Sequence, residues 1–341
     1  MYYLIKILLF IILVIILIIL INNVKNEVNH GDILVNVDNF ITVETHMYIS
    51  KYFEKIQKTN TFLHYRNFDV DNAVIRMNLD TLYSLAIIDT KKGSIKLVLP
   101  NVEDRYMSCC VLNENHKEIL FTKEGGEYVF PKSDKYLVCL IRILVKERTK
   151  EDINLVNKIQ DNIYIKTNFY STKLNIPKYD QKSYLYTKDL INKLFETVPN
   201  MSSVGMFGKK DEINELKHLM GVNMGWGGLN ETQAYYVSIF PENNNGIQEY
   251  SLTFSDVPVR AFWSIIIYNK DGFIIKDKKQ SLNNFTTKPN RDGSYTINFS
   301  NNDKKLNNLN IIKGWNYTIR LYEADEELIN GIWIFPELVK E

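Results

Sequence analysis

Cysteine and histidine are scarce in this sequence. Its 341 residues include three cysteines and five histidines. Three cysteines are too few, and odd in number, for a disulfide framework. The histidines are scattered and form neither an HExxH pair nor any other zinc spacing. We therefore expect no disulfide scaffold, no metal site and no cofactor.

An excess of charge of either sign is also absent. Outside residues 1–21, 40 basic side chains face 40 acidic ones. A chain so balanced has no overall field with which to attract polyanions, so we do not expect it to bind nucleic acid. The sequence also lacks a G-x-S-x-G nucleophile elbow, and the glycines of Gly225–Gly228 lack the Lys-Ser/Thr of a phosphate loop.

One long hydrophobic run opens the chain. Tyr2–Ile21 carries a single charge, Lys6, and a helix of this length spans roughly 30 Å, the thickness of the hydrocarbon core. The run predicts a transmembrane anchor over residues 1–22, because only a helix pairs all of its own backbone groups in lipid. A cleaved signal peptide is the alternative, but Leu20–Asn29 offers no small-residue cleavage site. We expect a single-pass membrane protein whose body is extracytoplasmic.

The rest of the chain alternates between strand-like and helical patterns. Helical spacing appears within residues 31–56, after Thr149 as an N-cap, along Leu190–Val198, and from Ile213 to a cap at Gly221. Apolar residues with a period of two predict strands elsewhere. The predicted strands are Val74–Asp80, Leu82–Asp89, Ser94–Leu99, Tyr106–Leu112, Glu118–Thr122, Glu127–Phe130, Tyr136–Val145, Ala234–Phe240, Tyr250–Phe254, Arg260–Tyr268, Phe273–Ile275, Ser294–Phe299 and Asn316–Tyr322.

These patterns predict a mainly β protein with an α-helical connector. We expect an N-terminal antiparallel β sheet or barrel over residues 34–180 and a helical connector over residues 181–229. A jelly-roll-like β sandwich is expected over residues 230–338. All four tryptophans lie at or beyond residue 226, which favours a separate core for this C-terminal domain.

A set of short motifs resembles a known pair of families. The motifs are Val37–Phe40, Val74–Ser84, Asp104–Ser108, Gly205–Gly208, Gly225–Gly228, Arg260–Ser264 and Gly314–Thr318. Their order is similar to that of the paired domain-of-unknown-function families 1254 (N-terminal) and 1214 (C-terminal), over roughly residues 34–338. The resemblance implies two mainly-β domains, the second sandwich-like, often in exported proteins, and it supplies no catalytic residues. Cys109 and Cys110 depart from the Val-Gln-like pair of the family, which puts in doubt a binding role for that strand.

A polar ladder is the leading candidate site. On a strand, Arg76, Asn78 and Asp80 share one face with successive members roughly 7 Å apart. An arginine there offers a planar, bidentate donor for an anionic or hydroxylated ligand. Asp80 could act as a catalytic base, or it could orient the Tyr83 hydroxyl. The alternative is a structural Arg–Asp network that fixes strand register or an oligomer contact.

Other residues are unusual for their position in the sequence. Arg142 stands in an apolar run, where it either joins Arg76 and Asp80 across the sheet or points outward. Arg320 adjoins aromatic residues, and we expect its stem to pack on them. Trp226 is either a core residue or a platform for a sugar ring. His46 and His116 could act as general bases. For both, however, a place in the core or on the surface without a catalytic role is the simpler interpretation.

These observations lead to two functional hypotheses. The first is a membrane-anchored protein that binds a small polar ligand, a glycan or a protein partner through its β domains, using Arg76, Asn78, Arg142 and Trp226. The second is a hydrolase of a small ester, sulfate ester or glycoside, in which Arg76 binds the substrate's charge beside Asp80 and Tyr83. A homo-oligomer with paired sheet edges is a third, structural possibility.

Overall fold

Strands dominate the part of the chain that the computed structural model describes, residues 32–68, 75–198, 202–275 and 278–341. Within these ranges four sheets contain sixteen strands, and none of the four closes into a barrel. The predicted mainly β class is therefore confirmed, as sheets rather than a barrel. The predicted anchor, residues 1–22, lies outside the described residues. Among the helices that are described, none has the length and apolar character needed to cross a membrane.

Two sheets build the N-terminal domain. The larger is antiparallel with the order β1-β2-β7-β4-β5, and the smaller has the order β6-β3-β8. Alternate residues of β2, such as Ala86 and Ile88, meet Ile95 and Leu97 of β3 in the core between the sheets, as a period of two requires. The strands are β1 (Phe62–His64), β2 (Thr81–Asp89), β3 (Ile95–Leu99), β4 (Met107–Asn113), β5 (Glu118–Thr122), β6 (Gly126–Phe130), β7 (Tyr136–Leu144) and β8 (Tyr164–Lys166).

Helix α2 (Phe40–Ile56) packs on the opposite face of the larger sheet. Its buried Ile49 belongs to the same cluster as Leu85 of β2 and Leu140 of β7. The helix therefore buries the second apolar face of the sheet, and the helix predicted within residues 31–56 is confirmed.

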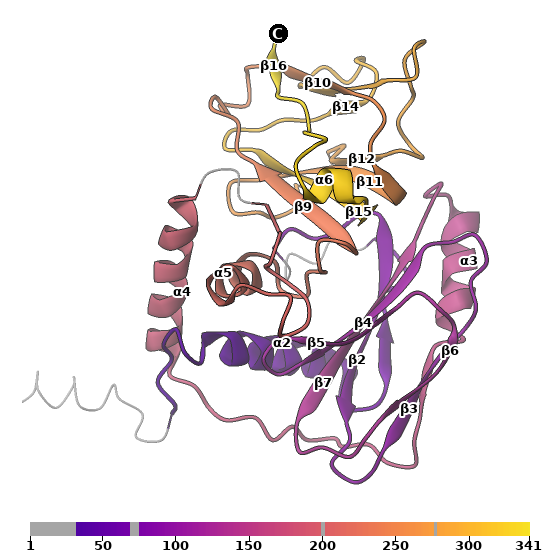
Figure 1. The fold of residues 1–341 in the computed structure, drawn as a ribbon, viewed down its shortest axis with the longest axis vertical. Coiled ribbons are helices and arrows are strands. Elements are labelled where there is room, and N and C mark those ends of the chain that lie inside the picture. Colours follow the sequence, from indigo (N-terminus) through magenta and orange to yellow (C-terminus); the bar gives the residue numbers. More distant parts are fainter. Residues whose placement is uncertain (1–31, 69–74, 199–201, 276–277) are drawn as a thin grey trace, which may run out of the picture.

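Helix α3 (Lys150–Gln160) follows β7 on the other side of the domain (Figure 1). As predicted, Thr149 is its N-cap, and the side chain accepts a hydrogen bond from the Asp152 backbone N–H. Val156 is fully buried and joins the core between the two sheets.

Helices α4 (Gln181–Glu196) and α5 (Glu215–Gly225) lie beside the junction between the two domains (Figure 1). The sequence predicted that α5 would end at Gly221, but it continues to Gly225. Gly221 serves close packing instead, because a Cβ there would lie 2.9 Å from Cβ of Met206. The glycine therefore marks a tight approach inside a helix rather than a helix end.

The C-terminal domain is a sandwich of two four-stranded sheets, with the orders β12-β11-β15-β9 and β14-β13-β10-β16. One core lies between them, and it includes Leu252, Ile265, Phe299, Trp315 and Ile319. A second cluster joins Ala234, Phe262 and Tyr322 of the sandwich to Trp226 and to the larger N-terminal sheet, so the sandwich has a core of its own and also packs on the N-terminal domain. Its elements are β9 (Ala234–Ile239), β10 (Tyr250–Phe254), β11 (Val259–Tyr268), β12 (Ser281–Asn283), β13 (Tyr295–Phe299), β14 (Asn308–Leu309), β15 (Asn316–Ala324), α6 (Glu326–Ile329) and β16 (Val339–Lys340).

The predicted strand Val74–Asp80 is wrong over its described residues, 75–80, which form a loop. Arg76 takes a left-handed conformation with φ of 54°, and its backbone N–H donates to the Gly272 carbonyl of the C-terminal domain at 2.8 Å. This contact across the domain junction replaces the ladder that alternation alone would favour. The short segment Phe273–Ile275 is likewise not a strand, because its backbone bonds locally to Asn269 and Gln280.

Candidate functional site

A cavity lies between the two domains. Its volume, counted over the positions that the centre of a water molecule can occupy, is about 190 Å³. Residues of β2 and β7 line it from the N-terminal domain, and residues of β9 and β15 line it from the C-terminal domain. The end of α5 and the Gly225–Gly228 loop complete the wall. A site at such a junction is a common place for a small ligand.

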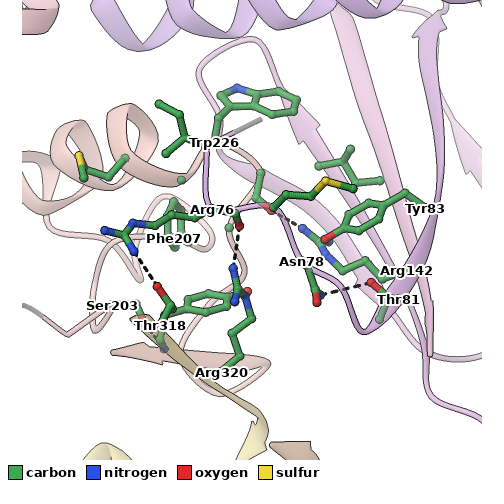
Figure 2. A pocket seen from close by; sticks show the side chains of 18 of the residues that line it. Arg76, Asn78, Thr81, Tyr83, Arg142, Ser203, Phe207, Trp226, Thr318 and Arg320 are labelled. Atoms are coloured by element: carbon green, nitrogen blue, oxygen red, sulfur yellow. Dashed lines mark hydrogen bonds between the residues drawn. The ribbon is translucent and has the colours of Figure 1, made fainter. Parts of the chain in front are cut away.

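Three arginines extend into this cavity (Figure 2). Arg142 comes from β7, where it pairs across the sheet with Tyr83. Arg320 comes from β15, where it pairs with Tyr236, and Arg76 comes from the loop before β2. Arg142 and Arg320 are each only 5% exposed. Because the Arg142 side chain is buried, it does not point outward to solvent, which was one of the two positions that the sequence allowed.

The hydrogen bonds of these arginines leave two guanidinium nitrogens free. Nη2 of Arg142 donates to the Gly227 carbonyl, and Nη2 of Arg320 donates to the Arg76 carbonyl at 2.7 Å. Nη1 of Arg76 donates to Thr318 Oγ1 at 2.8 Å. Nη1 of both Arg142 and Arg320 is buried and has no hydrogen-bond partner among the described residues. Unpartnered buried donors of this kind need a ligand or water.

The described residues that line the cavity include no group that would neutralise these cations. Among the described residues that line it there is no aspartate, glutamate, histidine, cysteine or lysine. Burial lowers the pKa of Arg76 to about 10, which leaves it charged at neutral pH. Burial also opposes the charge on Arg142 and Arg320, yet the pKa of each is raised overall, because Tyr83 beside Arg142 and Tyr268 beside Arg320 favour the cation.

Tyrosine hydroxyls add neutral donors beside the arginines. Burial raises the pKa of Tyr236 and of Tyr322, so both phenols keep their protons at neutral pH. The Tyr322 hydroxyl accepts a hydrogen bond from Nδ2 of Asn78 at 2.6 Å, which leaves its own proton available to a ligand. The side chain of Tyr83 lies beneath the Arg142 guanidinium, with 5.4 Å between Cζ and the ring centroid.

The glycine loop after α5 holds the Arg142 contact in place. Gly227 has a φ of 83°, and its N–H donates to Nε2 of His116 at 2.7 Å. Burial holds the pKa of His116 well below its ordinary value, so the ring is neutral and Nε2 can accept. At Gly228 a Cβ would lie 2.3 Å from the Phe207 ring. His116 therefore supports the cavity wall rather than facing the cavity as a base.

Trp226 lines the cavity but is 8% exposed. One face of its ring stacks on Tyr48, with 4.4 Å between the ring centroids. Its Nε1 donates to Thr45 Oγ1 at 3.2 Å. Trp226 is therefore packed as a core aromatic residue whose N–H has a hydrogen-bond partner, rather than as an exposed platform for a sugar ring.

Asp80 does not line the cavity. Its side chain is fully buried, and Oδ1 accepts hydrogen bonds from Arg148 Nη2 at 2.8 Å and from Asn283 Nδ2 at 2.9 Å. Arg148 also donates to Ser281 Oγ at 2.9 Å. These contacts join the N-terminal domain to β12 of the C-terminal domain. Asp80 thus belongs to a structural Arg–Asp network, with Arg148 as its partner and not Arg76 or Arg142.

The structure brings five of the predicted site residues to one cavity and adds others. Those that meet there are Arg76, Asn78, Tyr83, Arg142 and Trp226. The sequence interpretation missed the role of Arg320, for which only packing by its stem was expected. A signal was present, because Arg320, like Arg142, stands inside an apolar strand. His46 lies elsewhere, with Nδ1 2.6 Å from the Tyr179 hydroxyl.

Comparison with known structures finds this fold in two crystal structures. The VPA0106 protein from Vibrio parahaemolyticus is similar over 90% of this chain and 100% of its own, with a TM-score of 0.69 and 17% identity. A putative uncharacterized protein from Burkholderia cenocepacia is similar over 89% of this chain and 87% of its own, with a TM-score of 0.53 and 13% identity. These likenesses concern the fold alone. No curated protein matches this chain.

Two family matches fall in the order that the motifs predicted. Each family is described as a protein of unknown function. The N-terminal match covers β1 to β5 in part or whole, and the C-terminal match covers most of the sandwich. The resemblance is thereby confirmed: this chain carries a DUF1254 region at residues 59–120 followed by a DUF1214 region at residues 240–326.

Proposed function

We propose that this protein binds an anionic small molecule in the cavity between its two domains. The observation that carries the proposal is that Arg142 and Arg320 line a cavity that no carboxylate lines among the described residues, and that each has a buried Nη1 without a hydrogen-bond partner among them. A buried cation without a partner is costly, and an anion that accepts hydrogen bonds from both guanidinium groups would remove that cost. The two domains would then be joined through the ligand.

The chemistry of the lining favours binding over hydrolysis. A hydrolase needs a base or nucleophile within hydrogen-bond reach of its substrate. Asp80 is engaged with Arg148 and Asn283 outside the cavity, and burial raises the pKa of Tyr236 and of Tyr322, which keeps these two hydroxyls protonated. The small size of the cavity, about 190 Å³, also suits a small molecule better than a glycan chain or a protein surface.

We also propose that Tyr2–Ile21 anchors the protein in a membrane with the body extracytoplasmic. The support for this is the apolar run itself, which carries a single charge. Membrane fractionation of the full chain and of a chain beginning at residue 32 tests it. The full chain should resist extraction with alkaline carbonate, and the shorter chain should not sediment with membranes. Recovery of the full chain in the soluble fraction would contradict the anchor.

The binding proposal is tested by ligand-induced stabilisation. The midpoint of thermal unfolding is measured with inorganic phosphate, acetate and benzoate at constant ionic strength, and with benzamide as a neutral partner for benzoate. At least one anion should raise the midpoint in the wild-type protein, and benzamide should not. Arg142→Gln and Arg320→Gln should each remove most of the shift.

Arg260→Gln is the matched control, because Arg260 is exposed and pairs with Asp325 on the surface. This variant should respond to anions as the wild type does. A response that is equal for benzoate and benzamide, or that survives both cavity substitutions, would overturn the proposal.

A further inference from the structure

The cavity has a second, apolar half. It is formed by side chains from the larger N-terminal sheet, from α5 and from the segments before and after α5: Leu85, Leu140, Met206, Phe207, Met224 and Trp226. In Figure 2 Trp226 lies on the opposite side of the cavity from Arg320. Such a surface offers nothing to a compact, fully hydrated anion, so the arginines alone do not account for the shape of the site.

The polar and apolar halves meet at Arg142. Leu140 and Arg142 are two residues apart on β7, so their side chains leave the same face of the sheet. Gly227 lies against both. A Cβ built on this glycine would be 2.9 Å from Leu140 Cδ1 and 4.0 Å from Arg142 Nη2. An anionic group held by Arg142 would therefore place the atoms bonded to it against Leu140 and the neighbouring Trp226.

The size of the cavity limits the ligand. A site needs about 10–15 Å³ of this kind of space for each water-sized group. The 190 Å³ of the cavity thus accommodates roughly a dozen or more non-hydrogen atoms. After three to five atoms for an anionic head, roughly eight to ten atoms remain for an apolar body.

We infer that the ligand is an amphiphilic acid, with a carboxylate, sulfate or phosphate head at Arg142 and Arg320 and an apolar body along Leu140 and Trp226. This inference rests on the proposed anion binding and names its ligand class. The head satisfies the two free guanidinium nitrogens, and the body covers the apolar wall. An inorganic anion would fill the first role only.

The experiment measures affinity as a function of chain length. The dissociation constants of unbranched carboxylates with two to twelve carbons are determined by titration calorimetry below their micelle concentrations. Each added methylene should tighten binding roughly fourfold, because a buried CH₂ contributes about 0.8 kcal/mol. The gain should stop at about nine or ten carbons, where the cavity is full. Octyl sulfate and octyl phosphate, measured beside octanoate, identify the preferred head.

Gly225→Leu tests where the body lies. Gly225 lines the cavity, and a Cβ there would meet no atom within 4 Å. Its φ lies outside the left-handed region, so a leucine is tolerated by the backbone. The new side chain should fill the apolar half of the cavity. Affinity should then stop rising at a chain length of about five or six carbons. Gly93→Leu is the matched control, since a Cβ at Gly93 meets only Phe169 at 3.7 Å and neither residue lines the cavity.

The possible results separate this inference from the binding proposal. If acetate binds as tightly as octanoate, the amphiphilic class is wrong while anion binding stands. If affinity rises with chain length but Gly225→Leu leaves the profile as it is, the body lies elsewhere and the inference is overturned. If no acid binds, or if octanol binds as tightly as octanoate, the anion proposal itself fails.

Discussion

Arg148 on one side, and Arg142 with Arg320 on the other, lie at the domain junction and differ in what neutralises them. The Arg148 side chain is 26% exposed, whereas Arg142 and Arg320 are buried. Arg148 reaches a fully buried carboxylate, that of Asp80, and also bonds to Ser281 of the C-terminal domain. Arg142 and Arg320 donate to the backbone carbonyls of Gly227 and Arg76, and Arg320 also lies beside Tyr268. Among the described residues, Nη1 of each has no hydrogen-bond partner. A charge neutralised by the protein itself holds the structure together, whereas a charge left without a counter-ion is available for a ligand. The same residue type thus serves as a link in one place and as a binding group in the other.

The largest effect on stability should come from breaking the ion pair between Arg148 and Asp80. Arg148→Met leaves the buried Asp80 carboxylate without its charged partner, and we expect the free energy of unfolding to fall by about 3 kcal/mol or more. Urea unfolding measures this change. Asp80→Leu combined with Arg148→Met should recover much of the loss, because neither charge then remains buried. A loss of under 1 kcal/mol in the single variant would show that Asp80 does not depend on Arg148.

Acid should weaken the cavity wall at His116. Burial lowers the pKa of His116 far below 6.5, and protonation would end its acceptance of the Gly227 N–H. Below pH 6.5 the unfolded chain takes up a proton that folded His116 lacks, so the free energy of unfolding should decrease as pH falls, by about 1.4 kcal/mol per unit for this residue. Above pH 6.5 this contribution is constant.

Urea unfolding between pH 7.5 and 4.5 tests this dependence. His116→Asn keeps a residue that tolerates the positive φ of 55°, and it should flatten the slope. His64 is a matched control outside the cavity, since burial lowers its pKa to about 4. His64→Gln should remove a separate share of the slope while the cavity's anion binding stays as in the wild type. An unchanged slope in His116→Asn would contradict a neutral, supporting His116.

Removing a cavity arginine should have a smaller effect on stability than removing the link. Arg142→Met deletes an uncompensated buried charge and also one hydrogen bond to Gly227. Since these changes oppose each other, we expect the free energy of unfolding of the unliganded protein to stay within about 1 kcal/mol of wild type. Anion affinity should nevertheless fall tenfold or more in calorimetric titration. A loss of stability equal to that of Arg148→Met would remove the distinction between the two groups.

The smallest effect should come from an exposed pair. Arg260 and Asp325 form an ion pair at 3.2 Å, with side chains 66% and 44% exposed. Water and salt screen such a pair, so Arg260→Gln should change the free energy of unfolding by under about 0.5 kcal/mol. Urea unfolding of this variant sets the scale for the buried arginines. A loss as large as 2 kcal/mol would mean that exposure does not separate structural from surface pairs here.

Most elements of the fold follow from local sequence patterns. The period of two predicted β2 and β7 nearly to their ends, and Thr149 marked the start of α3. These signals are local because a strand buries alternate side chains and a cap bonds within its own first turn. The loop at residues 75–80 escaped prediction, since its conformation depends on Gly272, which is nearly 200 residues away in the chain.

The candidate site could be predicted only in part for the same reason. An arginine inside an apolar strand is visible in the sequence, and Arg142 was singled out on that ground. What the sequence does not reveal is the partner. The pairing of Asp80 with Arg148 instead of Arg76 reversed the interpretation of Asp80, from a candidate catalytic group to a structural one. The sequence around Arg320 predicts only packing by its stem, and its place in the cavity depends on the contact between the two domains.

The sequence by itself determined the apolar N-terminal run, the mainly β class, the order of the two family regions and the presence of arginines in apolar strands. These depend on composition and on spacing over a few residues. Only the tertiary structure decided which arginines are neutralised and which remain free. That choice rests on contacts between residues far apart in the chain, such as Asn78 with Tyr322 and Arg76 with Thr318. A buried charge has no fixed meaning until its neighbours in space are known.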